Sequence, residues 1–244
     1  FDGHDGGTAA LAFSTDGGRV VSGGADGIVR LTDWTNPAAG PIGRFEAGGA
    51  VTSVAVSPDL TLVMAARADA VVRTWTVADG MAGKDLVGHA GKILAVGFMA
   101  GNQPWSVGVD RGVKFWHLPD ARTSSTWELP SPPTAVALSA DGTALIAAGE
   151  DKLVRMHALA NGQVQQTFTG HAAAIRAVGL SADGKRMVSI ERDGARDGTF
   201  LWDVPTARLA EAVDRDVAPE SVVTGTLVDG TANSALNVIG DGRL

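Results

Sequence analysis

The chain contains no cysteine and no tyrosine among its 244 residues. Without cysteine there can be no disulfide, no thiolate nucleophile and no zinc or iron–sulfur site built on cysteine. The formal charge is −7, whereas a non-specific nucleic-acid binder is expected to carry a basic face, so we expect no nucleic-acid partner. No apolar run approaches the roughly 20 residues of a membrane helix, and no signal peptide is visible, so we expect no direct membrane insertion.

Glycine, in contrast, is abundant, with 32 residues, and a short motif recurs along the chain. In this motif a serine follows an apolar pair, and an aspartate stands two residues after the serine. Its serines are separated by 43, 82 and 42 residues and are Ser14, Ser57, Ser139 and Ser181. One copy is therefore absent near Met99, and the repeat length is about 42 residues.

Each repeat unit reads as short strands separated by tight turns. In the first unit the apolar runs cover residues 9–13, 19–22 and 28–31, and a fourth run crosses into the next unit at residues 43–45. Asp-Gly pairs follow the first and second runs, and they are strong hairpin signals because glycine adopts positive φ without steric cost. No segment shows a sustained 3.6-residue apolar period, so the sequence predicts an all-β fold.

Two kinds of residue pair mark the start and the end of the units. The Gly-His pairs contain His4, His89 and His171. The one complete Trp-Asp pair contains Trp202, and weakened versions contain Trp75 and Trp116. In these pairs and in its repeat length the chain resembles the WD40 family, with degenerate, bacterial-looking repeats that run in phase over nearly the whole sequence.

The resemblance implies a WD40-type β-propeller with four strands in each blade. We place five full repeats and a partial sixth in a single domain of residues 1–244. Their approximate bounds are 1–42, 43–84, 85–125, 126–166, 167–206 and 207–244. A propeller must close to protect its strand edges, so we expect a segment of a six- or seven-bladed propeller from a longer chain, or else closure by another chain.

The resemblance also implies a buried hydrogen-bonded tetrad in each blade. Its members are the histidine of the Gly-His pair, a serine of the second strand, an aspartate of the next turn and the tryptophan of the third strand. Two units have all four, which are His89, Ser106, Asp110 and Trp116, and His171, Ser189, Asp193 and Trp202. The first unit has Thr32 at the tryptophan position and keeps His4, Ser22 and Asp26.

The second and fourth units lack most of these residues. The second keeps the aspartate and the tryptophan but has Ala47 and Ala65 where the histidine and the serine belong. In the fourth, the four positions hold Leu129, Ala147, Asp151 and His157. Because a half-satisfied network costs stability, we predict that apolar packing replaces the polar network in these two units.

The recurring serine, histidine and aspartate would also suit a hydrolase triad. Three copies at fixed spacing and the absence of a Gly-x-Ser-x-Gly turn favour a structural role, so we expect no catalytic residues and no enzyme activity. His117 and His157 have no neighbouring ligand at metal-binding spacing, and the Asp-Gly turns lack the pattern of a calcium loop. We therefore expect no metal and no cofactor, and we expect Trp105 in the core.

In the WD40 family, the residue just before each turn aspartate commonly contacts partners. The candidate partner face of this chain comprises Ala25, Ala68, Val109, Glu150 and Arg192, with Lys92, Arg176 and Arg196 near them. No charged patch stands out, which suits a protein surface better than phosphate or nucleic acid. Residues 190–198 form a longer, densely charged segment, for which a solvated loop and a contact loop are equally acceptable interpretations.

These observations predict a protein–protein interaction scaffold, a rigid propeller that docks other subunits or domains of a larger assembly. The alternative is a non-catalytic propeller module of a larger multidomain enzyme or of a cofactor-bearing protein, for example a haem-binding one. A binder of carbohydrate or small ligands in the central channel would need several exposed aromatic residues, and tyrosine is absent. Fold alone does not dictate function, so these alternatives stay open at this point.

Overall fold

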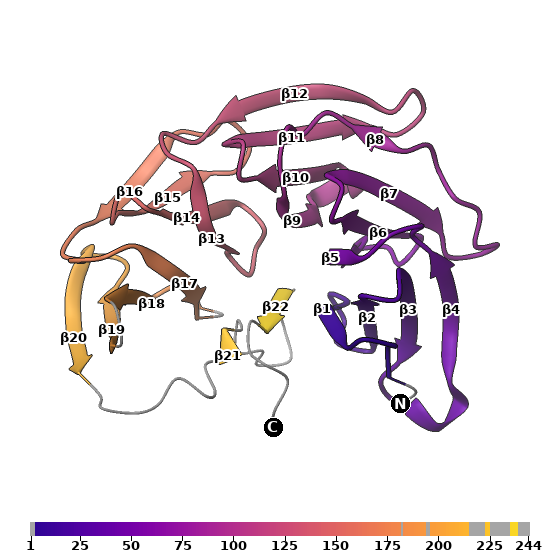
Figure 1. The fold of residues 1–244 in the computed structure, drawn as a ribbon, viewed down its shortest axis with the longest axis horizontal. Coiled ribbons are helices and arrows are strands. Elements are labelled where there is room, and N and C mark those ends of the chain that lie inside the picture. The colour runs from indigo at the N-terminus through magenta and orange to yellow at the C-terminus, as the bar shows by residue number, and fades with distance from the viewer. Residues whose placement is uncertain (1–2, 182, 194–195, 215–222, 225–234, 239–244) are drawn as a thin grey trace.

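The computed structural model describes residues 3–181, 183–193, 196–214, 223–224 and 235–238. These residues form 22 β-strands and two short 3-10 helices. Twenty of the strands make five antiparallel sheets of four strands, and Figure 1 shows them arranged as the blades of a propeller around a central axis. The prediction of an all-β, propeller-type fold is confirmed.

The blades follow one another in chain order, and each runs from an inner strand beside the axis to an outer strand (Figure 1). The first blade contains β1 (Thr8–Phe13), β2 (Arg19–Gly24), β3 (Ile28–Asp33), η1 (Pro37–Ala39) and β4 (Pro41–Glu46). The second contains β5 (Val51–Val56), β6 (Leu62–Arg67), β7 (Val71–Thr76) and β8 (Leu86–Val87). The third contains β9 (Ile93–Phe98), η2 (Ala100–Asn102), β10 (Pro104–Gly108), β11 (Gly112–His117) and β12 (Arg122–Glu128).

The last two complete blades have the same construction. The fourth contains β13 (Pro133–Leu138), β14 (Ala144–Gly149), β15 (Val154–Ala158) and β16 (Val164–Phe168). The fifth contains β17 (Ile175–Leu180), β18 (Arg186–Asp193), β19 (Arg196–Asp203) and β20 (Arg208–Asp214). Two short strands follow, β21 (Val223–Thr224) and β22 (Ala235–Val238), and β22 pairs with β1.

The recurring serine and aspartate stabilise the turn between the first and second strands. In the second blade Ser57 Oγ donates to Asp59 Oδ1 at 2.7 Å and accepts from the backbone N of Leu62 at 2.9 Å. The same two bonds form at Ser14, Ser139 and Ser181. In the third blade η2 takes the place of this turn, which is why the motif is missing from the sequence near Met99.

Neighbouring blades pack face to face and bury an apolar cluster at each of their four interfaces. Between the fourth and fifth blades, the buried rings of Phe168 and Trp202 meet edge-on with centroids 5.6 Å apart. Trp105 is fully buried between the third and fourth blades. The inner strands are also linked directly, since the backbone N of Val96 in β9 donates to Ser53 Oγ of β5 at 3.2 Å.

Figure 1 shows the five blades as an arc that is open between the fifth and first blades, with β21 and β22 in the opening. Closure of the ring by six or seven blades remains a prediction. Within the part of the chain that the structure describes, no helix is long and apolar enough to cross a bilayer.

The charged segment 190–198 belongs to a long hairpin. β18 and β19 pair continuously from Arg186 opposite Asp203 to Asp193 opposite Arg196. The interpretation of this segment as a loop is therefore wrong for the described residues, because the additional residues extend the antiparallel ladder by further paired positions. Residues 194 and 195 lie outside the described residues.

Candidate functional site

The turns between second and third strands, with the loops that lead into each inner strand, form one face of the propeller, which we call the turn face. In the third blade a chain of hydrogen bonds reaches this face from a buried tryptophan. Trp116 Nε1 donates to Ser106 Oγ at 2.9 Å, and Ser106 Oγ lies 2.7 Å from His89 Nε2. His89 Nδ1 lies 2.9 Å from Asp110 Oδ1, and because a carboxylate only accepts, Nδ1 donates and Nε2 accepts the serine proton.

The aspartate of this network connects two loops. Asp110, in the turn after β10, accepts from the backbone N of Ala90 at 2.8 Å, in the loop before β9. Burial would raise the pKa of Asp110, but the hydrogen bonds from Ala90 and His89 outweigh it, so the pKa is lowered and the carboxyl is ionised at neutral pH. Burial lowers the pKa of His89, against the effect of Asp110, so the imidazole is neutral. The charged acceptor therefore fixes the histidine tautomer and the loop together.

The fifth blade repeats the network with a different acid. Trp202 Nε1 donates to Ser189 Oγ at 2.6 Å, and Ser189 Oγ lies 2.7 Å from His171 Nε2. The acid that faces His171 Nδ1 is Glu191, at 3.0 Å, so the prediction of Asp193 in this place is wrong. The long β18–β19 hairpin explains the exchange, because its ladder carries Asp193 two residues beyond the position that faces the histidine.

Glu191 has the same connecting role that Asp110 has in the third blade. Its Oε2 accepts from the backbone N of Ala172 at 2.8 Å and of Ala173 at 3.1 Å, in the loop before β17. The side chain is buried, and burial likewise lowers the pKa of His171 although Glu191 acts in the opposite direction. Glu191 reaches the loop before β17 from a paired position of β18, because its side chain is longer. Asp110 reaches the loop before β9 from the turn after β10.

The first blade keeps three of the four residues and adds a cation. His4 Nδ1 lies 2.9 Å from Asp26 Oδ1, and His4 Nε2 lies 2.9 Å from Ser22 Oγ. Thr32 stands at the tryptophan position and is buried. Arg30 Nη1 lies 2.6 Å from His4 Nδ1 and 3.4 Å from Asp26 Oδ2, so a guanidinium takes part where the other networks have none.

In the second and fourth blades the turn aspartates bind arginine in place of histidine. Arg67 Nε donates to Asp69 Oδ1 at 3.0 Å, and Arg67 Nη1 donates to the carbonyl oxygen of Ala47, which occupies the histidine position, at 3.1 Å. Arg155 Nη1 donates to Asp151 Oδ2 at 2.6 Å. The prediction of purely apolar replacement needs correction here. Apolar side chains do fill the buried positions at Ala65, Leu129 and Ala147, but the aspartate still requires a partner.

The sequence contains a signal for one of these arginines, Arg155, that the repeat pattern alone did not reveal. A cation stands two residues before the tryptophan position in the first four units, at Arg30, Arg73, Lys114 and Arg155. Residues two apart on a strand point to the same face, so these cations share the face of the tetrad. The pairing still depends on long-range geometry, because Arg73 binds Asp85 of its own blade through two bonds of 2.5 and 2.8 Å.

The two histidines outside the networks lie apart from one another. His157 is buried, donates from Nδ1 to the carbonyl oxygen of Gly162 at 3.0 Å and stacks on Trp127 with centroids 5.4 Å apart. His117 lies at the end of β11 in the neighbouring blade, 2.9 Å from Asp120 Oδ1. Among the residues that the structure describes, no three His, Asp or Glu side chains are grouped so that they could hold a metal ion.

Backbone hydrogen bonds add to the rigidity of the turn face. In three blades the residue before the turn aspartate donates its N–H to a carbonyl oxygen of the loop that enters the blade. The pairs are Ala25 with Gly7 at 3.3 Å, Ala68 with Ala50 at 2.9 Å and Val109 with Lys92 at 2.9 Å. In the first and third blades the turn aspartate also accepts from a backbone N–H of the entering loop, so two kinds of bond hold these turns against the loop.

The family model described as "WD domain, G-beta repeat" matches residues 1–33, 40–76 and 162–203. The chain therefore contains WD40 repeats in these three segments. It is 28% identical over 196 residues to autophagy-related protein 16 of Arabidopsis thaliana. It is also 36% identical over 117 residues to WD repeat-containing protein 1-B of Xenopus laevis. It is 22% identical over 236 residues to the serine-threonine kinase receptor-associated protein of Gallus gallus.

These similarities cover 80%, 47% and 94% of the WD40 chain, respectively. The chain spans 38%, 19% and 65% of the three relatives, so it corresponds to a part of each of them. None of the three organisms is a bacterium, and the bacterial character that the degenerate repeats suggested is not borne out.

The candidate contact residues of this WD40 chain lie on the turn face. Val109, Glu150 and Lys92 are exposed there, and Arg176 is half-buried in β17. Ala25 and Ala68 are exposed at the corresponding turn positions of the first and second blades. Two further candidates, Arg192 and Arg196, are placed by their backbone near the end of the β18–β19 hairpin. The turn face therefore carries exposed residues on turns that the buried networks fix in position.

Proposed function

We propose that this WD40 chain is a protein-interaction scaffold whose turn face docks other proteins or domains of a larger assembly. The observation that carries the proposal is the burial of the two network serines. Ser106 and Ser189 are each 0% exposed, so no substrate can approach the hydroxyl that a hydrolase would use. What the networks do hold in place is the surface above them.

The rigidity of the turn face favours binding. Loops that are ordered before a partner arrives lose little conformational entropy on binding, and more of the contact energy is left for affinity. The exposed Val109 and the opposite charges of Lys92 and Glu150 give this face the mixed character of a protein interface. The Gallus gallus relative is, by its name, a receptor-associated protein, which supports protein partners for this chain as well.

The proposal is tested by purifying tagged protein from its own cells with its bound proteins. The variant Lys92→Glu with Glu150→Lys reverses two charges on the turn face and leaves the net charge unchanged. Its matched control, Ser124→Glu with Gln165→Lys, changes two exposed residues of the outer strands β12 and β16 by the same net amount of zero. We expect the wild type and the control to recover the same proteins.

The turn-face variant should recover these proteins at a level lower by about tenfold, which corresponds to about 1.4 kcal/mol of binding free energy. Equal recovery by all three forms would contradict docking on the turn face. Equal loss in the variant and its control would contradict it as well, because the effect would then not depend on that face.

A further inference from the structure

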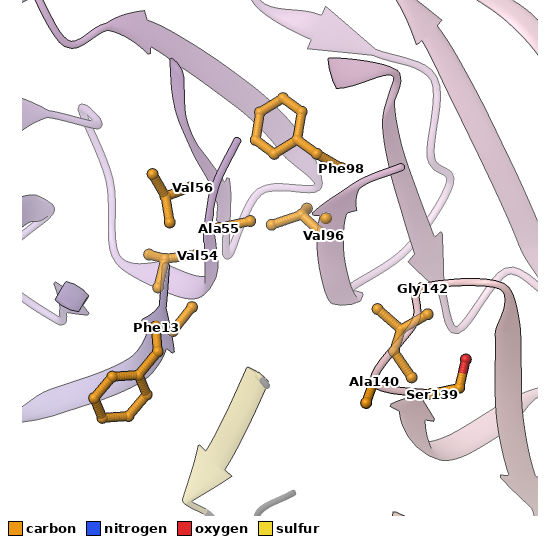
Figure 2. A pocket seen from close by; sticks show the side chains of 12 residues that line it. Phe13, Val54, Ala55, Val56, Val96, Phe98, Ser139, Ala140 and Gly142 are labelled. Atoms are coloured by element: carbon orange, nitrogen blue, oxygen red, sulfur yellow. The ribbon is translucent and has the colours of Figure 1, made fainter. Parts of the chain in front are cut away.

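The central channel ends in an apolar hollow at the side opposite the turn face, and we call this hollow the channel mouth. The inner strands run away from the turn face, so their carboxyl ends meet there (Figure 1). The hollow is open rather than enclosed, and the empty space between its lining atoms, open solvent included, is about 490 Å³. Figure 2 shows side chains from the ends of β1, β5 and β9 on one side and from the turn after β13 on the other.

The side chains that line the channel mouth are mostly apolar. The second and third blades contribute Val54, Val56, Val96 and Phe98, and among the lining residues that the structure describes only Ser139 carries a hydroxyl. That hydroxyl already donates to Asp141 and accepts from the backbone N of Ala144 at 2.9 Å. The lining side chains therefore offer a sugar or a phosphate no free hydrogen-bonding group, whereas an aliphatic or aromatic side chain would bury apolar surface against them.

The apolar surface continues from the mouth to an exposed tryptophan. Phe13 lines the mouth and meets Trp34 edge-on, with ring centroids 6.0 Å apart. Trp34 is 51% exposed. The mouth and this ring together form one apolar patch.

The rim of the patch is acidic. The turns between the first and second strands of the first four blades cover residues 14–19, 57–62, 99–104 and 139–144, and their only charged residues are Asp16, Asp59, Asp141 and Arg19. Arg19 lies 3.9 Å from Asp33, which partly neutralises it. The hydrogen bonds from Ser14 and Ser57 lower the pKa of Asp16 and Asp59, so these exposed carboxyls are ionised at neutral pH.

We infer that the channel mouth binds a peptide segment in which an apolar side chain is flanked by lysine or arginine. The apolar side chain fills the hollow, and the flanking cations meet the carboxylates of the rim. This surface lies at the opposite end of the propeller from the turn face, so it would serve a second partner, or a second contact of the same partner.

The test uses three synthetic peptides with the same Leu-Phe-Leu centre and with two lysines, two glutamates or two serines on each side. Binding is measured by calorimetry and by the tryptophan fluorescence of the protein. We expect saturable binding of the lysine peptide, and binding of the other two that is weaker by about tenfold or more, with the difference reduced in high salt. No saturable binding of the lysine peptide, or equal binding of the glutamate peptide, would overturn the inference.

A pair of variants locates the site. Ala140→Arg places a long cation in the mouth, and Ala78→Arg places the same side chain in the exposed turn after β7, at the same end of the molecule but outside the lining. We expect about tenfold weaker binding of the lysine peptide for Ala140→Arg and less than about twofold for Ala78→Arg. Equal affinities of Ala140→Arg and the wild type would overturn the inference.

A milder variant keeps the test decisive if Ala140→Arg does not fold. Asp59→Asn with Asp141→Asn removes two rim charges, while the amide oxygens can still accept the hydrogen bonds of both turns. We expect it to bind the lysine peptide about fivefold more weakly and the serine peptide with unchanged affinity. An unchanged affinity for the lysine peptide would show that the rim does not recognise cations and would overturn the inference.

Discussion

Ser106 and Ser189 each accept a hydrogen bond from a tryptophan ring and donate one to a histidine ring. The order of serine, histidine and carboxylate is that of a hydrolase triad, and the distances alone would not exclude one. Burial decides between the two roles, because a nucleophile must be reachable and these hydroxyls are not. The same three side chains therefore act as a structural support.

Each of the two complete networks depends most on its serine, because the serine hydroxyl bonds both the tryptophan and the histidine ring. Ser106→Ala leaves His89 Nε2 and Trp116 Nε1 buried without a partner, and each such group costs roughly 1–3 kcal/mol. We expect urea denaturation to give a free energy of unfolding lower by about 2–4 kcal/mol. Ser124→Ala, on the exposed strand β12, is the control and should change it by less than about 0.5 kcal/mol. An unchanged midpoint for Ser106→Ala would contradict the network.

The exchange of acids in the fifth blade can be tested directly. Glu191→Ala should lower the free energy of unfolding by about 2–3 kcal/mol, because His171 Nδ1 and two backbone N–H groups lose their acceptor. Asp193→Ala should change it by less than about 0.5 kcal/mol, since the hydrogen bond to His171 does not involve it. Thermal or urea denaturation of the two variants distinguishes them, and the reverse order of effects would restore Asp193 as the partner of His171.

The buried histidines should make stability depend on pH. Burial lowers the pKa of His89, His157 and His171 from the ordinary 6.5. Below that value the unfolded chain binds protons that the folded chain does not, so stability is complete above it and is lost as the pH falls toward the folded-state pKa values. We expect a lower free energy of unfolding at a pH of about 5 than at about 7.5.

A variant assigns part of this pH dependence to a single residue. His157→Phe keeps an aromatic ring against Trp127 and removes one titrating group, so the difference between the two pH values should become smaller. Urea denaturation at both pH values measures it. Stability that does not change between them in the wild type would mean that the histidines titrate alike in the folded and unfolded chains.

At the scale of the elements, the sequence predicts the strands and the short turns well. The Ser-Asp and Asp-Gly motifs are local, and the hydrogen bonds of Ser57 with Asp59 and Leu62 follow from the motif itself. The length of the β18–β19 hairpin is not local. Whether residues 190–198 bend into a loop or continue as a ladder depends on which cross-strand pairs form, and the spacing of charges does not reveal that.

The repeat pattern did not predict the arginine–aspartate pairs of the second and fourth blades either. A turn aspartate that also accepts backbone N–H groups is retained when its histidine is lost, because it still shapes the turn. Its new partner is a cation of a neighbouring strand position, as Arg155 is for Asp151. Predicting this would require knowledge of which side chains share a face at the end of the blade.

A double-mutant cycle measures the strength of this replacement. Arg155→Gln and Asp151→Asn should each lower the free energy of unfolding, and the double variant should cost less than the sum of the two. We expect a coupling of roughly 1 kcal/mol, since the pair is partly shielded from solvent and its oxygen–nitrogen distance is 2.6 Å. Strictly additive effects would show that the ion pair contributes nothing to the fourth blade.

At the scale of the whole molecule, the repeat length predicts the propeller but not the surfaces at the two ends of its central channel. Each interface between neighbouring blades buries its own apolar cluster, so the packing of one blade depends on the next. The channel mouth was not predicted, because its lining comes from the ends of strands in four different units. Such a surface arises only when the blades are arranged around the axis.

The buried networks are expected to hold the turn face in one conformation before a partner binds. Amide hydrogen exchange followed by NMR tests it at the backbone N–H of Ala90, which donates to Asp110, with Ala68 of the second blade as the internal reference. We predict that both amides are protected in the wild type, and that His89→Ala removes the protection of Ala90 while that of Ala68 is kept. Fast exchange of Ala90 in the wild type, or protection unaffected by His89→Ala, would contradict the claim.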